Sequence, residues 1–296
     1  MINKKNVFYQ GVLWAVLTLL SVTMLSCSGN SLNKLALDIS KMSHLRSAEL
    51  KGGKFTLRVY YRFDKLGAPL HIYLEGDGKA WLNRNNASHN PTPRNPVGLR
   101  LAVRDYADNV MYIARPCQYV SFDKNPDCNY PYWTHKRFAP EVIDSVSAVI
   151  DLGKKKAKAR ELQIIGFSGG GAVAILVSAH RQDVTGIRTV AGNLDHKTWT
   201  RYHNVDSLKG SLNAVDVANK VASIPQIHFV GGLDKNIDRR VVLSFKAKSG
   251  PGACLQIKEI LGASHIKGWA KLWVRMNKIK LPDCGKVKGV SSSFHS

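Results

Sequence analysis

Short apolar segments rich in β-branched and aromatic residues recur along the chain, and helix-like segments separate them. Strands that alternate with helices predict a mostly parallel sheet with helices on both faces. The expected strands are 55–63, 71–74, 110–113, 162–165, 187–190, 226–230 and 255–260, and the expected helices include 97–106, 141–152 and 171–180. We therefore predict one α/β domain over residues 55–280, with a small lid insertion possible at 193–222.

The composition is that of a globular protein with a large positive charge. Of 296 residues, 44% are hydrophobic, which excludes intrinsic disorder as the main state. Lys and Arg number 43 against 21 Asp and Glu, a formal charge of +22. Such a surplus is compatible with nucleic acid, an anionic membrane surface, acidic substrates or a basic surface without a dedicated partner. No RNA-binding signature, zinc finger or basic zipper accompanies the basic run 154–160, so nucleic acid is disfavoured.

The first residues have the plan of a secretory signal, because Lys4 and Lys5 precede an apolar run over 7–25. The run ends in Met24-Leu25-Ser26-Cys27, which resembles the lipobox of bacterial lipoproteins. The resemblance implies removal of residues 1–26 and a lipid on Cys27. It also implies the periplasmic side of the outer membrane, because Ser28 is not the aspartate associated with inner-membrane retention. An uncleaved anchor and an ordinary cleaved signal are the alternatives. We expect 27–54 to link this segment to the domain and 281–296 to form a tail.

Four cysteines remain after Cys27, and an even number in an exported chain indicates disulfides. The pairing with the shortest loops joins Cys117 to Cys128 and Cys254 to Cys284. Four buried free thiols are the alternative. A zinc site is not expected, because the cysteines lack the close spacing that zinc sites use.

The sharpest motif is Gly166-Phe167-Ser168-Gly169-Gly170, which follows an apolar strand and precedes a helix of small residues. A G-x-S-x-G turn in this context holds the serine hydroxyl at the edge of the sheet, at a helix N-terminus. The amide of Gly169 then points to where a carbonyl oxygen would gain negative charge. The alternatives are a glycine-rich packing turn and a dinucleotide fingerprint over residues 169–174. The fingerprint fits poorly, because no acidic residue stands at the required distance.

A serine hydroxyl needs a base and an orienting carboxylate before it can attack. Asp234 follows the strand 226–230 in a glycine turn, and His265 follows the strand 255–260. Carboxyl ends of strands are where open α/β sheets place their sites. Asp195 and His196 are a competing acid and base. His228 lies inside an expected strand, where a structural role is more usual.

At these residues the chain resembles the α/β-hydrolase fold superfamily over about 55–280. The segments YLEGDG, PTPRNP, ARPCQY and AGNLDH (73–78, 91–96, 114–119 and 191–196) are similar to a group of exported bacterial α/β hydrolases of vague function. The resemblance implies Ser168 as nucleophile, His265 as base and then acid, and Asp234 as its orienter. It also implies an oxyanion hole made by Gly169 and one of Gly76, Asp77 and Gly78.

The expected function is hydrolysis of an acyl substrate, a carboxylic ester first, with no cofactor and no metal. Thioesterase, peptidase or acyltransferase chemistry uses the same groups, and a non-catalytic binding or envelope lipoprotein is a further alternative. In sequence terms Glu75 and Asp77 are not expected to be a pair of metal ligands, because no histidine or further carboxylate is spaced nearby as a site would need. The aromatic residues Trp81, Tyr132, Trp133 and Phe138 either line a pocket or hold down loops. The expected partners are the acyl substrate and the membrane, with anionic headgroups possible.

Overall fold

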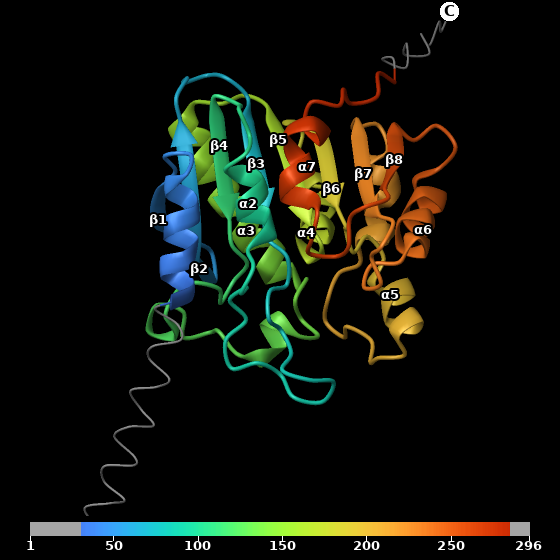
Figure 1. The fold of residues 1–296 in the computed structure, drawn as a ribbon, viewed down its shortest axis with the longest axis horizontal. Coiled ribbons are helices and arrows are strands. Elements are labelled where there is room, and N and C mark those ends of the chain that lie inside the picture. Colours follow the sequence, from blue (N-terminus) through green and yellow to red (C-terminus); the bar gives the residue numbers. More distant parts are fainter. Residues whose placement is uncertain (1–30, 285–296) are drawn as a thin grey trace, which may run out of the picture.

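The protein is described here by a computed structural model that covers residues 31–284. Its eight-stranded sheet has the order β1-β2-β4-β3-β5-β6-β7-β8 (Figure 1). The strands are β1 (Arg46–Gly52), β2 (Phe55–Phe63), β3 (Leu70–Leu74), β4 (Asn109–Ile113), β5 (Leu162–Phe167), β6 (Val184–Val190), β7 (Gln226–Gly231) and β8 (Leu255–Ile260). β2 runs antiparallel to β1 and β4, whereas every other neighbouring pair is parallel. The predicted mostly parallel sheet is confirmed.

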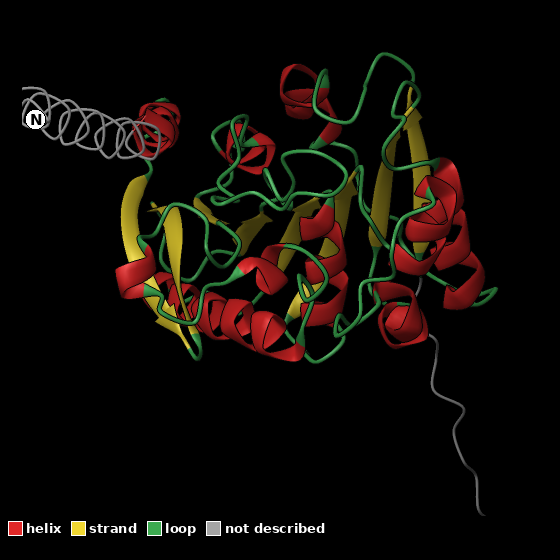
Figure 2. Cartoon of the chain, turned by 90° about the horizontal axis from the view of Figure 1, so that it is seen from below, coloured by secondary structure: helices red, strands yellow, loops and turns green. Residues whose placement is uncertain are grey.

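Helices cover both faces of this sheet, as Figure 2 shows from below. One face packs against α3 (Pro140–Ala157), α4 (Gly169–Ser178), η3 (Ala214–Val221) and α6 (Arg239–Ser249). The other packs against a helix over residues 31–41, α2 (Val97–Ala102) and α7 (Trp269–Met276). α5 (His196–His203) and the short helices η1 (Phe122–Lys124) and η2 (Tyr130–Trp133) lie in connections. The central strands are buried on both faces, which explains their continuous apolar sequences.

The domain begins earlier than residue 55, so the predicted linker 27–54 needs correction. β1 pairs with β2 along seven residue pairs from Arg46 to Gly52. Its sequence RSAELKG is polar, and most of the strand is exposed or half-buried. An edge strand needs little apolar surface, so the hydrophobic pattern gave no sign of it.

The segment 193–222 does not form one lid. α5 lies at the lower end of the sheet in Figure 1, where the connections after the parallel strands gather. η3 instead packs into the helical layer, with Ala214, Val215, Ala218 and Val221 buried. Only the first part of this segment is therefore placed to bound a site.

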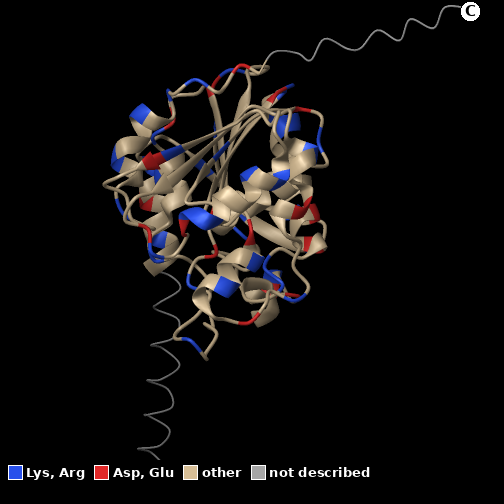
Figure 3. Ribbon diagram, turned by 90° about the vertical axis from the view of Figure 1, so that its right-hand side faces the viewer, with Lys and Arg blue, Asp and Glu red and all other residues tan. Residues whose placement is uncertain are grey.

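The cysteines form the two short-loop pairs, Cys117–Cys128 and Cys254–Cys284. The second disulfide ties the end of the described chain to the start of β8. Within residues 31–284 no helix is both long and apolar enough to span a bilayer. The signal or anchor segment and Cys27 lie outside the described residues. Figure 3 shows Lys and Arg on helices and loops throughout the view rather than on one face.

His228 in β7 is a buried side chain with a consequence for stability. It is 1% exposed, its Nδ1 lies 2.8 Å from Thr189 Oγ1, and its Nε2 has no hydrogen-bond partner among the described residues. Burial lowers the pKa of His228 to about 3. Its position inside a strand, away from Ser168, fits the structural role expected from the sequence.

We predict that His228 makes the protein acid-sensitive below pH 6.5. The unfolded chain gains a proton on this histidine as the pH falls through about 6.5, whereas the folded chain stays neutral down to about pH 3. The free energy of unfolding should therefore fall by about 1 kcal/mol per pH unit from this group alone. Urea unfolding between pH 7 and 4.5 should give a shallower pH dependence for His228→Gln. An equal slope in both proteins would contradict this origin.

Candidate active site

Ser168 occupies a sharp turn between β5 and α4. Its backbone has φ 52° and ψ −120°, a conformation that non-glycine residues rarely adopt. Glycines flank Ser168 because neighbouring backbone atoms come too close to these positions to leave room for a Cβ. A Cβ on Gly166 would overlap the carbonyl of Gly170, and one on Gly170 would overlap the carbonyl of Leu74. The sequence GFSGGG is thus required by packing, and it presents the hydroxyl of Ser168 at the start of α4.

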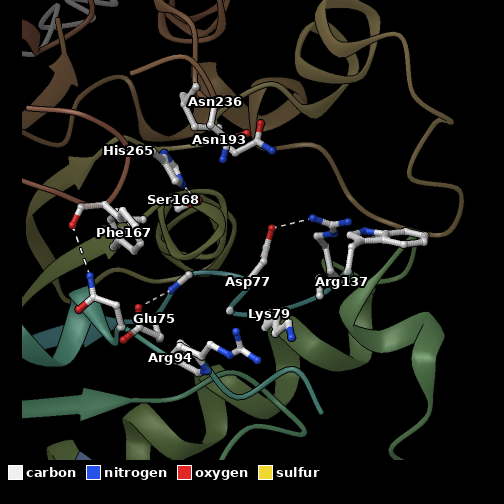
Figure 4. A pocket seen from close by; sticks show the side chains of 18 of the residues that line it. Glu75, Asp77, Lys79, Arg94, Arg137, Phe167, Ser168, Asn193, Asn236 and His265 are labelled. Carbon is white, nitrogen blue, oxygen red and sulfur yellow. Dashed lines mark hydrogen bonds and ion pairs between the residues drawn. The ribbon is translucent and has the colours of Figure 1, made fainter. Parts of the chain in front are cut away.

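The structure brings the three predicted residues Ser168, His265 and Asp234 into one line. Figure 4 shows the first two, Ser168 and His265, side by side. Ser168 Oγ lies 3.1 Å from His265 Nε2, and His265 Nδ1 lies 2.9 Å from Asp234 Oδ2. Residues from the ends of β5, β7 and β8 therefore meet at one edge of the sheet. In this arrangement Nδ1–H donates to the carboxylate, so Nε2 is free to accept the serine proton.

The side chains of this line are held by their surroundings. The carboxylate of Asp234 is fully buried, and its Oδ1 accepts hydrogen bonds from the amides of Asn236 and Ile237 at 2.8 and 2.9 Å. His265 packs its ring against Phe167, with ring centroids 5.3 Å apart. Its carbonyl accepts a hydrogen bond from Trp269 Nε1 in α7. The acid is shielded from water, and the imidazole has one orientation.

The turn after β3, residues 75–78, lies directly over Ser168. A Cβ on Gly76 would come 3.3 Å from the Cβ of Ser168, and one on Gly169 would overlap the carboxylate of Asp77. The amide of Gly76 already donates to Glu75 Oε1 at 2.9 Å. The amides of Asp77 and Gly78 make no hydrogen bond within the described part of the chain. Of the three predicted second donors, Gly76 is thus committed elsewhere, and the other two are free.

The carboxylate of Glu75 holds the turn 75–78 in place through hydrogen bonds. Its buried carboxylate accepts hydrogen bonds from the amides of Gly76, Gly98 and Leu99 and from the hydroxyl of Tyr112 at 3.1 Å. Burial raises the pKa of Glu75, although these donors partly offset the effect. The carboxylate ties the turn to the start of α2, so it has a structural role and no free lone pair directed at the pocket.

Asp77 is held by two arginines that arrive from distant parts of the sequence. Its carboxylate accepts from Arg115 Nη1 at 3.1 Å and from Arg137 Nη1 at 2.8 Å. Burial would raise the pKa of Asp77, but attraction to Arg137 and Arg115 outweighs it and lowers the pKa below its ordinary value. Arg115 also donates to the carbonyl of Arg137, which joins the two cations into one buried cluster.

A cavity of about 550 Å³ opens in front of Ser168, a volume suited to a small molecule. Its wall includes apolar, amide and cationic side chains. The lining comprises residues 75–81, Pro93, Arg94, Asn95, Arg137, Phe167, Ser168, Asn193, Trp199, Asn236, Ile237, His265 and Ile266. Most of these residues belong to segments singled out from the sequence, but Lys79, Arg137 and Trp199 lie outside every recognisable motif.

Asp195 and His196 do not reach Ser168 and have other roles. The carboxylate of Asp195 caps α5 by accepting from the amides of Lys197 and Thr198, and it also accepts from Ser244 in α6. Burial opposes ionisation of Asp195, but hydrogen bonds from Asn213, Thr198 and Ser244 lower its pKa to about 2. His196 is buried and stacks on Phe138. The helix-capping alternative therefore describes Asp195.

The aromatic residues divide between the two expected roles. Trp81 lines the cavity and is 43% exposed. Tyr132 packs edge-on against Phe55, Trp133 donates to the carbonyl of Ser88, and Phe138 is fully buried, so these three hold down connections. Trp199 of α5 is a cavity residue that the sequence did not single out. Across residues 31–284, no group of three His, Cys, Asp or Glu residues is arranged to hold a metal ion.

No protein-family model and no curated protein sequence matches the chain. Solved structures do resemble it. An esterase from Pyrococcus furiosus has 14% identity and a TM-score of 0.56 over 81% of this chain and 90% of its own. The esterase Est1E from Butyrivibrio proteoclasticus has 13% identity and a TM-score of 0.54 over 78% and 95%.

One larger protein and a further full-length one share the same fold. An acylaminoacyl peptidase from Pyrococcus horikoshii has 14% identity and a TM-score of 0.58 over 80% of this chain but only 42% of its own. A putative α/β hydrolase from Agrobacterium tumefaciens has 14% identity and a TM-score of 0.53 over 80% and 100%. At these identities the likeness concerns the fold alone, and together with the strand order it confirms the prediction that the chain has the α/β-hydrolase fold.

Proposed function

We propose that this protein is a serine hydrolase that cleaves an acyl substrate, with a carboxylic ester as the first candidate. The observation that carries the proposal is the line from Ser168 Oγ through His265 to Asp234, with distances of 3.1 and 2.9 Å. It begins at a serine held in a strained turn at the mouth of a cavity. Strain of this kind is retained where the surrounding structure maintains it, which is common at active sites.

The geometry supplies each step of acyl transfer. His265 Nε2 takes the Ser168 proton as Oγ attacks the acyl carbon, and the buried Asp234 carboxylate stabilises the imidazolium that forms. The amide of Gly169 at the start of α4 and a free amide of the opposing turn, that of Asp77 or Gly78, would bind the oxyanion. His265 then gives its proton to the leaving group, and water releases the acyl group by the same steps in reverse. Transfer to another acceptor, or cleavage of a thioester or amide, uses the same groups.

Esterase chemistry is the first choice because the full-length structural neighbours include esterases. Peptidase chemistry has weaker support, since this chain spans less than half of the acylaminoacyl peptidase that it resembles. A non-catalytic binding role has no feature in its favour at this site, where serine and imidazole are already within hydrogen-bonding distance.

We predict covalent labelling of Ser168 by a fluorophosphonate probe and hydrolysis of short activated esters. Ser168→Ala should take no label and lose at least about a thousandfold in kcat, because only oxyanion and substrate binding remain. Asp234→Asn should also lose activity, and it should label more slowly because its imidazole is no longer correctly oriented. Ser207→Ala, which removes an exposed hydroxyl outside the cavity, is the matched control. Equal labelling of Ser168→Ala, or its full function in cells, would contradict the proposal.

The charges beside the oxyanion site supply a second test. A bare Asp77 carboxylate next to Gly169 would repel the negative charge that develops during attack. Arg115 and Arg137 offset that charge in the structure. The two ion pairs thus allow a carboxylate to stand beside an oxyanion site and also fix the turn that carries the second amide donor.

We predict that Arg137→Met lowers kcat for a neutral ester by at least about tenfold, because it leaves Asp77 partly uncompensated. Adding Asp77→Asn to Arg137→Met removes the excess negative charge and should recover most of that loss. Steady-state kinetics with thermal unfolding curves for each variant would separate the charge effect from misfolding. If the double variant is as slow as Arg137→Met while both are folded, the electrostatic explanation is wrong.

We further propose that the chain is exported and held at a membrane by a lipid on Cys27. The two disulfides are compatible with an oxidising compartment. The helix over residues 31–41 begins at the lower end of Figure 1, the end at which the connections after the parallel strands gather. Four residue steps from Cys27 to residue 31 reach at most about 14 Å. A lipid there would keep the catalytic edge near the membrane surface.

Metabolic labelling with an alkyne fatty acid in a bacterial host tests this placement. We expect the wild type to take up label and to fractionate with membranes, and Cys27→Ser to take up none. An unlabelled wild type that remains in membranes would indicate an uncleaved anchor instead. An unlabelled wild type in the soluble fraction would indicate an ordinary cleaved signal.

A further inference from the structure

The cavity in front of Ser168 is lined by more positive than available negative side chains, and the proposed hydrolytic mechanism gives the unpaired cations no role. Three cationic side chains line it, those of Lys79, Arg94 and Arg137. Arg137 is paired with Asp77. Lys79 and Arg94 have no ion pair and no side-chain hydrogen bond within residues 31–284. Figure 4 labels both among the lining residues, on segments that follow β3.

Neither carboxylate that lines the cavity is available to neutralise them. Glu75 is buried and fully engaged with three amides and Tyr112. Asp77 is shared between two arginines. Asp234 lies behind His265 and is already fully buried against amides. The free charges that face the cavity are therefore positive.

The position of Lys79 places this charge close to the chemistry. Lys79 directly follows the turn 75–78, and its amide donates to the carbonyl of Pro91 at 2.9 Å, so its backbone is fixed. Its side chain is half-buried, whereas Arg94 is exposed at the rim. Arg94 belongs to the segment 91–96, whose Asn95 donates to the carbonyl of Ile266 across the cavity at 3.4 Å. A partly desolvated ammonium without a protein partner is expected to bind an anion.

We propose that Lys79 and Arg94 form an anion subsite, and that the substrate carries a carboxylate or phosphate group on the part that does not react. This inference rests on the proposed serine hydrolase function and adds the charge of its substrate. Trp81, Trp199 and Ile237 supply apolar wall to the same cavity. The substrate class is therefore an amphiphilic acyl compound with one apolar portion and one anionic group.

Matched ester pairs test the proposal by turnover. Mono-4-nitrophenyl adipate and its methyl ester place the charge on the acyl side, and 4-acetoxybenzoate and its methyl ester place it on the leaving group. 4-Acetoxyphenyl phosphate replaces that carboxylate with phosphate and so distinguishes the two anions. The readout is the ratio of kcat/KM for the anionic and neutral members, measured for wild type, Lys79→Met, Lys79→Arg, Arg94→Gln and the control Lys155→Met.

We expect the wild type to favour the anionic member of at least one pair. Losing either cation should lower that ratio roughly fivefold, the usual worth of one partly exposed charge contact. Lys79→Arg should retain most of the preference. Lys155→Met, an exposed change at the far end of α3, should keep both activity and ratio, because it alters only the overall charge. Two results would overturn the anion subsite. One is that the wild type prefers the neutral member of every pair, and the other is that the kcat/KM ratio is unchanged in both Lys79→Met and Arg94→Gln.

A binding measurement separates this inference from the proposed reaction. Calorimetric titration of Ser168→Ala with monomethyl adipate and with inorganic phosphate needs no turnover. The same titration is repeated on two double variants, in which Ser168→Ala is combined with Lys79→Met or with Lys155→Met. Saturable binding that is weaker in the Lys79→Met double variant, but unchanged in the Lys155→Met one, would support the subsite even if no ester is cleaved. Failure of both anions to bind, alongside Ser168-dependent cleavage of neutral esters, would reject the subsite and leave the hydrolase proposal intact.

Discussion

The strained backbone of Ser168 is the constraint on which the arrangement of the candidate site depends. Its φ of 52° is maintained only because β5 enters the turn at full burial and α4 leaves it through three consecutive glycines. The close approach of Gly170 to the carbonyl of Leu74 brings the turn after β3 against the same point. One packing contact therefore sets both the direction of the Ser168 hydroxyl and the position of the amides in the opposing turn.

The second layer of this edge is electrostatic. Glu75 and Asp77 stand two residues apart, yet one binds amides from the start of α2 and the other binds two buried arginines. Both carboxylates are removed from water, and each has enough donors to compensate. Together they clamp a short turn from opposite sides. In the sequence EGDG, hydrogen bonds and ion pairs rather than bulky side chains hold the turn that faces Ser168.

Much of the architecture could be predicted from the sequence because the central strands are continuous apolar runs that end in glycine turns. Ser168, Asp234 and His265 each follow such a run, so their meeting at one edge follows from parallel topology alone. Arg115 and Arg137 could not be found this way. They contact Asp77 across 38 and 60 residues, and no motif links them to it. β1 was also missed, because an edge strand needs no apolar face.

The positive charges of the chain form two groups, those spread over the surface and the two at the cavity in front of Ser168. Basic residues are spread over helices and loops, so most of them act together as a diffuse positive field that attracts any anion. Such a field falls off within about 10 Å in salt and cannot distinguish one anion from another. Two cations that line a cavity differ from it, because Lys79 is half-buried and therefore less screened, and both belong to segments that bound the space in front of Ser168. If the protein is the proposed hydrolase, Lys79 and Arg94 therefore bear on which acyl compound reaches Ser168, whereas the diffuse charge does not discriminate between compounds of the same sign.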